Sequence, residues 1–128
     1  MHVERSVAMD NKRALAAVLV ALVASTVNAE EGWRDAGKIG QIDMVVIDKG
    51  KEKDQDVYRM AIESVCMDRN WCRVLFWSDP TLVPKKLPMT DAQVKGLTAS
   101  WTYNGSTQLR KLLWACRIVN DPSQCFSE

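Results

Sequence analysis

Histidine is nearly absent from this 128-residue sequence, and the one that it has is His2. Nucleophilic sites of the Ser-His-Asp and Cys-His type need an imidazole, and so do His-ligated metal centres. No serine stands in a G-x-S-x-G turn, and the six glycines form no phosphate-binding loop. The sequence therefore predicts no catalytic residue, no metal site and no bound cofactor.

The sequence also lacks an apolar run long enough to cross a membrane as a helix, which takes about 20 residues. Its longest run, residues 14–24, is uncharged and follows Lys12 and Arg13. Small and polar residues come next and end at Ala29. This three-part order is typical of a secretory signal. We expect residues 1–29 to be a signal peptide that is cut after Ala29.

The part of the chain after residue 29 has no excess of charge of either sign. Residues 1–29 hold three of the 17 basic and two of the 16 acidic side chains, which leaves 14 of each. A balanced domain has no long-range field to attract nucleic acid or an anionic membrane. We therefore expect no nucleic-acid partner, no membrane anchoring after cleavage, and a periplasmic or secreted location. Met9 is an alternative start, because the segment from Met9 to Ala29 is a complete signal by itself.

Cysteine is present in an even number: Cys66, Cys72, Cys116 and Cys125. In a small exported domain this count is typical of two disulfides. Four cysteines allow three pairings, and proximity favours Cys66 with Cys72 and Cys116 with Cys125. Zinc is the disfavoured alternative, because five and eight intervening residues differ from the usual short spacing of zinc ligands.

The first half of the exported part predicts a strand, a helix and a second strand. Residues 30–40 are polar and contain glycine, so we expect a flexible lead-in. Residues 41–48 have a continuous apolar centre, which favours a buried strand. Asp54 is placed to cap a helix over residues 55–68, and the aromatic, β-branched residues 72–78 favour the second strand. This order suggests a crossover unit with two parallel strands.

The second half opens with three prolines spaced four residues apart within residues 79–89, which predicts a stiff surface loop. Thr90 begins a capping-box pattern and should start a helix. Residues 97–103 fit either a strand or a continued helix, and we favour a short helix followed by a strand. We expect a last helix over residues 108–119.

These elements predict an α+β fold, or a small α/β fold, in a single compact domain over residues 41–128. Two or three helices would cover a sheet of two or three strands, and two disulfides would staple it. Trp77 and Trp114 lie on apolar elements and are expected in the core.

Six residues are candidates for a functional site. Trp33 and Trp71 lie outside the strongest apolar segments, and Lys85 and Lys86 lie in the proline loop. Asp79 and Asp91 flank that loop and could act as a catalytic carboxylate pair, although each also suits a turn or a helix start. The possible binding surface consists of Trp33, Trp71, Asp79, Lys85, Lys86 and Asp91.

These patterns favour an exported, non-catalytic binding protein of the adaptor or inhibitor type. Its partner would be a protein or an envelope glycan, met through the stiff proline loop. Two alternatives remain open: a small carboxylate-dependent hydrolase and a structural component of the cell envelope.

Overall fold

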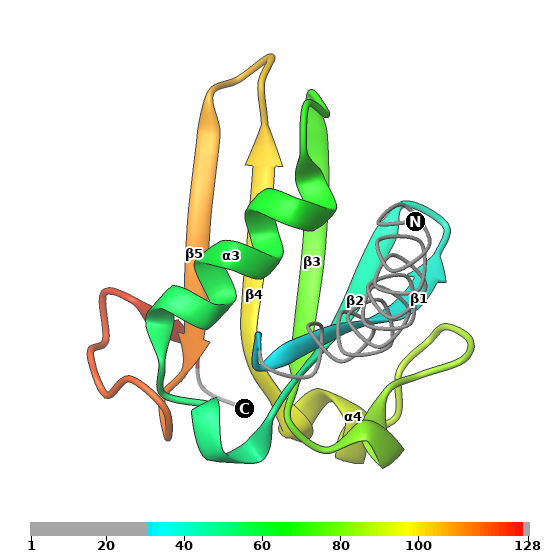
Figure 1. Cartoon of the computed structure of the whole chain (residues 1–128), viewed down its shortest axis with the longest axis vertical. Coiled ribbons are helices and arrows are strands. Elements are labelled where there is room, and N and C mark those ends of the chain that lie inside the picture. The colour runs from blue at the N-terminus through cyan, green and yellow to red at the C-terminus, as the bar shows by residue number, and fades with distance from the viewer. Residues whose placement is uncertain (1–30, 127–128) are drawn as a thin grey trace, which may run out of the picture. The chain divides into compact units, whose positions relative to one another are not determined.

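The computed structural model of the chain describes residues 31–126, and a mixed six-stranded sheet contains much of this part (Figure 1). The predicted signal peptide, residues 1–29, lies outside the described residues. The strands are β1 (Trp33–Ile39), β2 (Ile42–Ile47), β3 (Trp71–Trp77), β4 (Leu97–Asn104), β5 (Leu109–Ala115) and β6 (Cys125–Phe126). Their order across the sheet is their order in the chain. Neighbours run antiparallel except for the parallel pairs β2–β3 and β5–β6.

The predicted strand–helix–strand unit is confirmed. Helix α3 (Gln55–Cys66) connects β2 to the parallel strand β3. Asp54 caps the helix, since its carboxylate accepts a hydrogen bond of 3.1 Å from the Asp56 N–H. A parallel pair needs such a crossover because the chain must return to the same end of the sheet.

The predicted proportion of helix to sheet is wrong. A sheet of two or three strands under two or three helices was expected, but the described residues form six strands and one long helix. The remaining helical segments are short: η1 (Lys49–Lys51), η2 (Pro80–Leu82) and α4 (Asp91–Gly96). The protein is therefore mostly sheet.

The largest single error is the helix expected over residues 108–119, where the chain forms strand β5 instead. Leu109, Leu112 and Leu113 have helical spacing, which suggested one buried helical face. In the sheet, Leu112 lies opposite Trp101 on one face, while Leu109 and Leu113 lie on the other. Because both faces bury apolar side chains, the strand shows no simple alternation.

The expected flexible lead-in, residues 30–40, instead contains strand β1. An extra residue in β1 shifts its register against β2 between Asp35 and Gly37, which makes a β-bulge. Gly37 has a φ of 110°, a conformation that glycine adopts without steric conflict. The extra residue interrupts the alternation of side chains by which a strand is recognised in a sequence.

The helix-then-strand alternative for the segment after the proline loop is confirmed. Thr90 begins α4 with a complete capping box: its hydroxyl accepts from the Gln93 N–H, and the Gln93 side chain accepts from the Thr90 N–H. Strand β4 follows directly and joins β5 in an antiparallel hairpin.

Both faces of the sheet carry a hydrophobic core. On the α3 face, the Tyr58 ring lies between Phe76 and Trp114, with ring centroids 5.0 and 4.6 Å away. On the opposite face, Trp77 packs with Leu75 and with residues of the proline loop. Trp77 and Trp114 are 0% and 3% exposed, so their predicted place in the core is confirmed.

Two disulfides join neighbouring elements, in the pairing that proximity favours. Cys66 at the end of α3 bonds to Cys72 in β3, and Cys116 after β5 bonds to Cys125 in β6. The first bond fixes the end of the helix against the sheet. The second holds the short strand β6 beside β5.

Candidate functional site

The structure separates the six residues of the predicted binding surface. Trp33 begins β1 and packs against the core of the α3 face. Trp71 begins β3 on the opposite face, because its neighbour Cys72 points toward α3. The charged residues Asp79, Lys85, Lys86 and Asp91 all follow the far end of β3, and β3 itself spans about 20 Å at the usual rise per strand residue. These residues do not form one surface.

Asp79 and Asp91 occupy helix starts. The Asp79 carboxylate caps η2 by accepting bonds from the Thr81 N–H (3.0 Å) and the Thr81 hydroxyl (2.7 Å). These hydrogen bonds lower the pKa of Asp79, whereas a general acid needs a raised one. Asp91 is exposed in the first turn of α4. Lys85 and Lys86 are exposed beside a shallow hollow that Thr90 and Gln93 also line.

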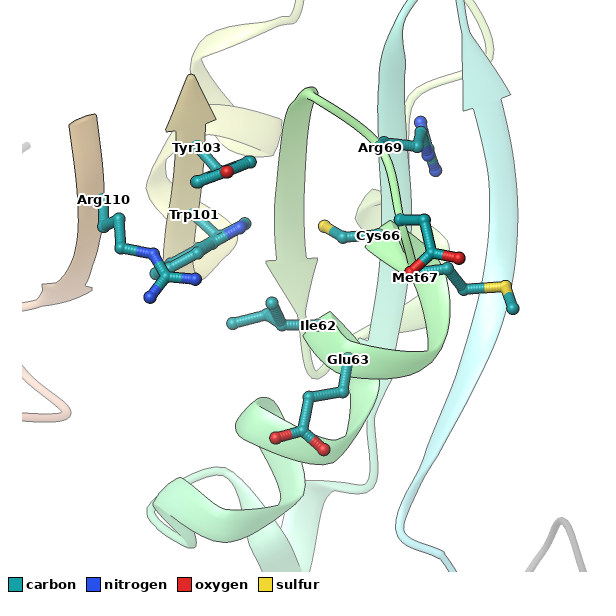
Figure 2. A pocket seen from close by; sticks show the side chains of 9 residues that line it. Ile62, Glu63, Cys66, Met67, Arg69, Trp101, Tyr103 and Arg110 are labelled. Atoms are coloured by element: carbon teal, nitrogen blue, oxygen red, sulfur yellow. The ribbon is translucent and has the colours of Figure 1, made fainter. Parts of the chain in front are cut away.

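Another concave surface lies on the α3 face, between α3 and strands β4 and β5 (Figure 2). Figure 1 shows α3 passing across β3, β4 and β5 on this face. Two adjoining hollows of about 260 and 400 Å³ lie there. Because both are lined by Ile62, Glu63, Trp101 and Arg110, we treat them as one feature, the α3–β5 groove.

The floor of the α3–β5 groove is apolar. Trp101 and Leu112 lie opposite each other across β4 and β5, and both are partly buried. The Trp101 Nε1 atom is buried without a hydrogen-bond partner within residues 31–126, and Figure 2 shows it turned toward Cys66. The groove therefore meets the hydrocarbon part of the indole ring. Ile62 of α3 adds an apolar wall.

Charge lines the rim. Arg110 of β5 places its guanidinium 5.3 Å from the centre of the Tyr103 ring, a cation–π contact. Among residues 31–126, no carboxylate lies within ion-pair distance of Arg110. Glu63 projects from α3 on the other side of the groove (Figure 2). Arg110 is thus an exposed cation that is free to meet a ligand.

Arg69, at the end of the groove beyond α3, is already paired. Its guanidinium donates to the Asp43 carboxylate (2.8 Å) and to the Val65 carbonyl (2.7 Å). The Asp43 side chain is 8% exposed, so this pair compensates a buried charge. Arg69 therefore has a structural role and is not a free ligand-binding cation.

Met67 follows α3 at the same end of the groove and has an unusual backbone. Its φ is 41°, a left-handed value that non-glycine residues rarely adopt, and the residue is 78% exposed. Strained residues of this kind gather at binding and catalytic sites. Met67 lines the end of the groove, although Figure 2 shows its thioether directed away from Trp101 and Arg110.

Sequence reasoning missed Trp101 and Arg110 as site residues. The alternation over residues 97–103 already favoured Trp101 and Tyr103 on one face of a strand. Arg110 joins them through the β4–β5 register, in which it lies opposite Tyr103. The helix predicted over residues 108–119 hid this relation. A strand there would have placed all three on one face.

The described part of the chain contains neither a candidate metal cluster nor a candidate membrane-spanning helix. Residues 31–126 contain no group of three or more histidine, cysteine or acidic side chains that could hold a metal ion. In the same part, no helix is long and apolar enough to span a bilayer. Comparisons with protein-family models, with curated proteins and with solved structures find no significant match for this chain.

Proposed function

We propose that this protein is an exported, non-catalytic binding protein whose ligand site is the α3–β5 groove. The observation that carries the proposal is the combination of an apolar floor, Trp101 and Leu112, with an exposed Arg110 that has no ion-pair partner among residues 31–126. Binding hot spots are enriched in tryptophan and arginine for this reason: one supplies apolar area and the other a directed charge.

The catalytic alternative has less support. Acid–base hydrolysis of a glycoside uses two carboxyl groups that flank the bond to be cut. The carboxyl groups that line the α3–β5 groove, Glu63 and Asp68, both come from the α3 side, so they do not lie on opposite sides of a bound ligand. Binding without turnover fits this arrangement better.

The proposed location is the periplasm or the cell exterior. Disulfides such as Cys66–Cys72 and Cys116–Cys125 form and persist in oxidising compartments. The predicted signal peptide, residues 1–29, is the second support for export. A protein or an envelope glycan remains the proposed partner, without nucleic acid and without membrane anchoring after cleavage.

Affinity capture from the cell envelope tests the proposal. The oxidised protein isolated from its own cells is immobilised beside two charge-reversal variants, Arg110→Glu and Lys38→Glu. Both residues are exposed cations on strands, but Lys38 lies on β1, away from the groove. We expect a partner that the wild-type protein and Lys38→Glu retain and that Arg110→Glu loses. Equal retention by all three proteins, or no partner at all, would contradict the proposal.

A further inference from the structure

The outer edge of β5 is open over most of its length. Strand β6 pairs with β5 at Trp114 and Ala115 alone. Along residues 109–113, no strand of the described part of the chain pairs with β5 on the side away from β4. Figure 1 shows this portion of β5 at the margin of the sheet. An open edge is a template for a further strand.

The direction of the backbone groups follows from one hydrogen bond. The Trp114 N–H donates to the Gln124 carbonyl at 2.9 Å, on the side away from β4. Alternate residues of an antiparallel strand direct their N–H and C=O groups to the same side. The backbone groups of Leu112 and Arg110 therefore also point outward, while those of Lys111 point toward β4.

The same two residues border the α3–β5 groove. Arg110 and Leu112 share a sheet face with Trp101, because Leu112 lies opposite Trp101 in the register. An added strand that bonds to their backbone would place every second side chain on that face. These side chains would extend over the apolar floor and past Arg110.

We propose that an extended, acidic segment of a partner protein adds to the sheet as a strand along β5. Its backbone bonds to Arg110 and Leu112, and its alternate side chains enter the α3–β5 groove. This inference rests on the proposed function, since it names the class of partner that the groove binds. In this mode of recognition, backbone bonds supply affinity and side-chain sites supply specificity.

Charge selects this occupant over a second copy of the chain. Arg110 and Lys111 are adjacent exposed cations on the open edge. Two β5 edges paired with each other would bring four such cations together, and like charges on neighbouring strands are destabilising. An acidic segment would instead pair with them. Glu63 would repel an acidic segment, but it lies on α3, on the side of the groove opposite to β5.

The test uses three eight-residue peptides and the oxidised, ¹⁵N-labelled full chain. In the first peptide, glutamate alternates with valine and leucine. In the second, lysine replaces glutamate. The third repeats the first with every internal backbone nitrogen methylated, so that it has no N–H to donate to a strand. Hydrogen exchange is measured at each amide of β5.

We expect the acidic peptide to slow exchange at the Arg110 and Leu112 amides by about tenfold or more at saturation, because bound strand amides are protected. The lysine peptide and the methylated peptide should leave both amides unchanged. Equal protection by the methylated peptide, or by the lysine peptide, would overturn the inference. So would protection at these amides that rises with the concentration of the protein alone, since this would make a second copy the occupant.

A pair of variants separates the backbone bond from the charge. Arg110→Ala removes the charge and keeps the outward N–H, whereas Arg110→Pro removes both and leaves the bonds to β4 in place. We expect Arg110→Pro to bind the acidic peptide about fivefold more weakly than Arg110→Ala, the effect of one net hydrogen bond. Equal affinities would overturn strand addition. If Arg110→Pro does not fold, the methylated peptide gives the same information.

Failure of this inference and failure of the proposed function are distinguishable. A partner captured through Arg110 that no peptide displaces, and that leaves the Arg110 and Leu112 amides exposed, would overturn strand addition and leave the groove as a binding site. Absence of any partner that depends on Arg110 would overturn both.

Discussion

Strand β1, at one margin of the sheet, and strand β5, which β6 pairs with only at Trp114 and Ala115, differ in whether another strand can join them. In β1, the bulge between Asp35 and Gly37 interrupts the register, and the Asp35 carboxylate accepts a bond of 2.8 Å from the Gly37 N–H. In β5, the register with β4 runs without a shift from Leu109 to Trp114. Bulges are a common protection of sheet edges. One extra residue thus closes one edge, and its absence leaves the other open.

The charges of the two strands differ in the same sense as their openness to a further strand. The exposed charges of β1 alternate in sign, with Arg34, Asp35 and Lys38. Those of β5 are both positive, Arg110 and Lys111. A mixed edge is neutral to any partner, whereas a positive edge discriminates in favour of an acidic one. The comparison predicts that β1 has a structural role and that β5 has a binding role.

Truncation of Trp114, the buried tryptophan of β5, should have the largest effect on stability. Trp114 is 3% exposed and packs against Tyr58, so Trp114→Ala should lower the free energy of unfolding by about 3–5 kcal/mol. Trp33 of β1 is partly buried, and Trp33→Ala should be milder. Urea unfolding measures both. A larger loss for Trp33→Ala would mean that β1, not β5, carries the packing.

Removal of the disulfide beside β5 should have the second largest effect on stability. The double variant Cys116→Ala, Cys125→Ala should lower the free energy of unfolding by about 2–3 kcal/mol, from the greater freedom of the unfolded chain. It should also release β6 and speed hydrogen exchange at the Trp114 amide, which now donates to the Gln124 carbonyl directly before β6. Unchanged exchange at Trp114 would indicate that β6 stays in place without the bond.

Alkaline pH should weaken the core on the β5 side. Burial raises the pKa of Tyr58 from 10.0 to about 12. The stabilisation from a neutral, buried phenol is complete below pH 10 and is lost as the pH rises toward 12, because the unfolded chain ionises first. We expect a loss of about 2 kcal/mol over this window. Tyr58→Phe should remove that part of the pH dependence, and an unchanged profile would exclude Tyr58 as its source.

The smallest effect concerns the bulge of β1. Gly37→Ala should lower the free energy of unfolding by about 1 kcal/mol, because alanine at a φ of 110° is strained. Gly50→Ala is the matched control: a Cβ at Gly50 meets no atom within 4 Å. It should change stability by less than about 0.5 kcal/mol. Equal effects would show that the bulge does not require glycine.

Local signals in the sequence predicted the part of the fold that depends on near neighbours. Asp54 and Thr90 mark helix starts because their side chains bond backbone groups two or three residues away. The two disulfides join cysteines six and nine positions apart. Such features do not depend on the rest of the fold.

The candidate site could not be predicted in the same way. Trp101 and Arg110 meet because Trp101 lies opposite Leu112, and Tyr103 opposite Arg110, in the β4–β5 register. A register of this kind is set by tertiary packing, and the leucine spacing in residues 109–113 fitted a helix equally well. Because that segment was predicted as a helix, neither the open edge of β5 nor the α3–β5 groove could be predicted.

Hydrogen exchange of the free protein tests the openness of β5 most directly. The account predicts slow exchange at the Lys111 amide, which points toward β4, and fast exchange at the Arg110 and Leu112 amides on either side of it. Equally slow exchange at all three amides would mean that the edge is already covered, and would contradict the account.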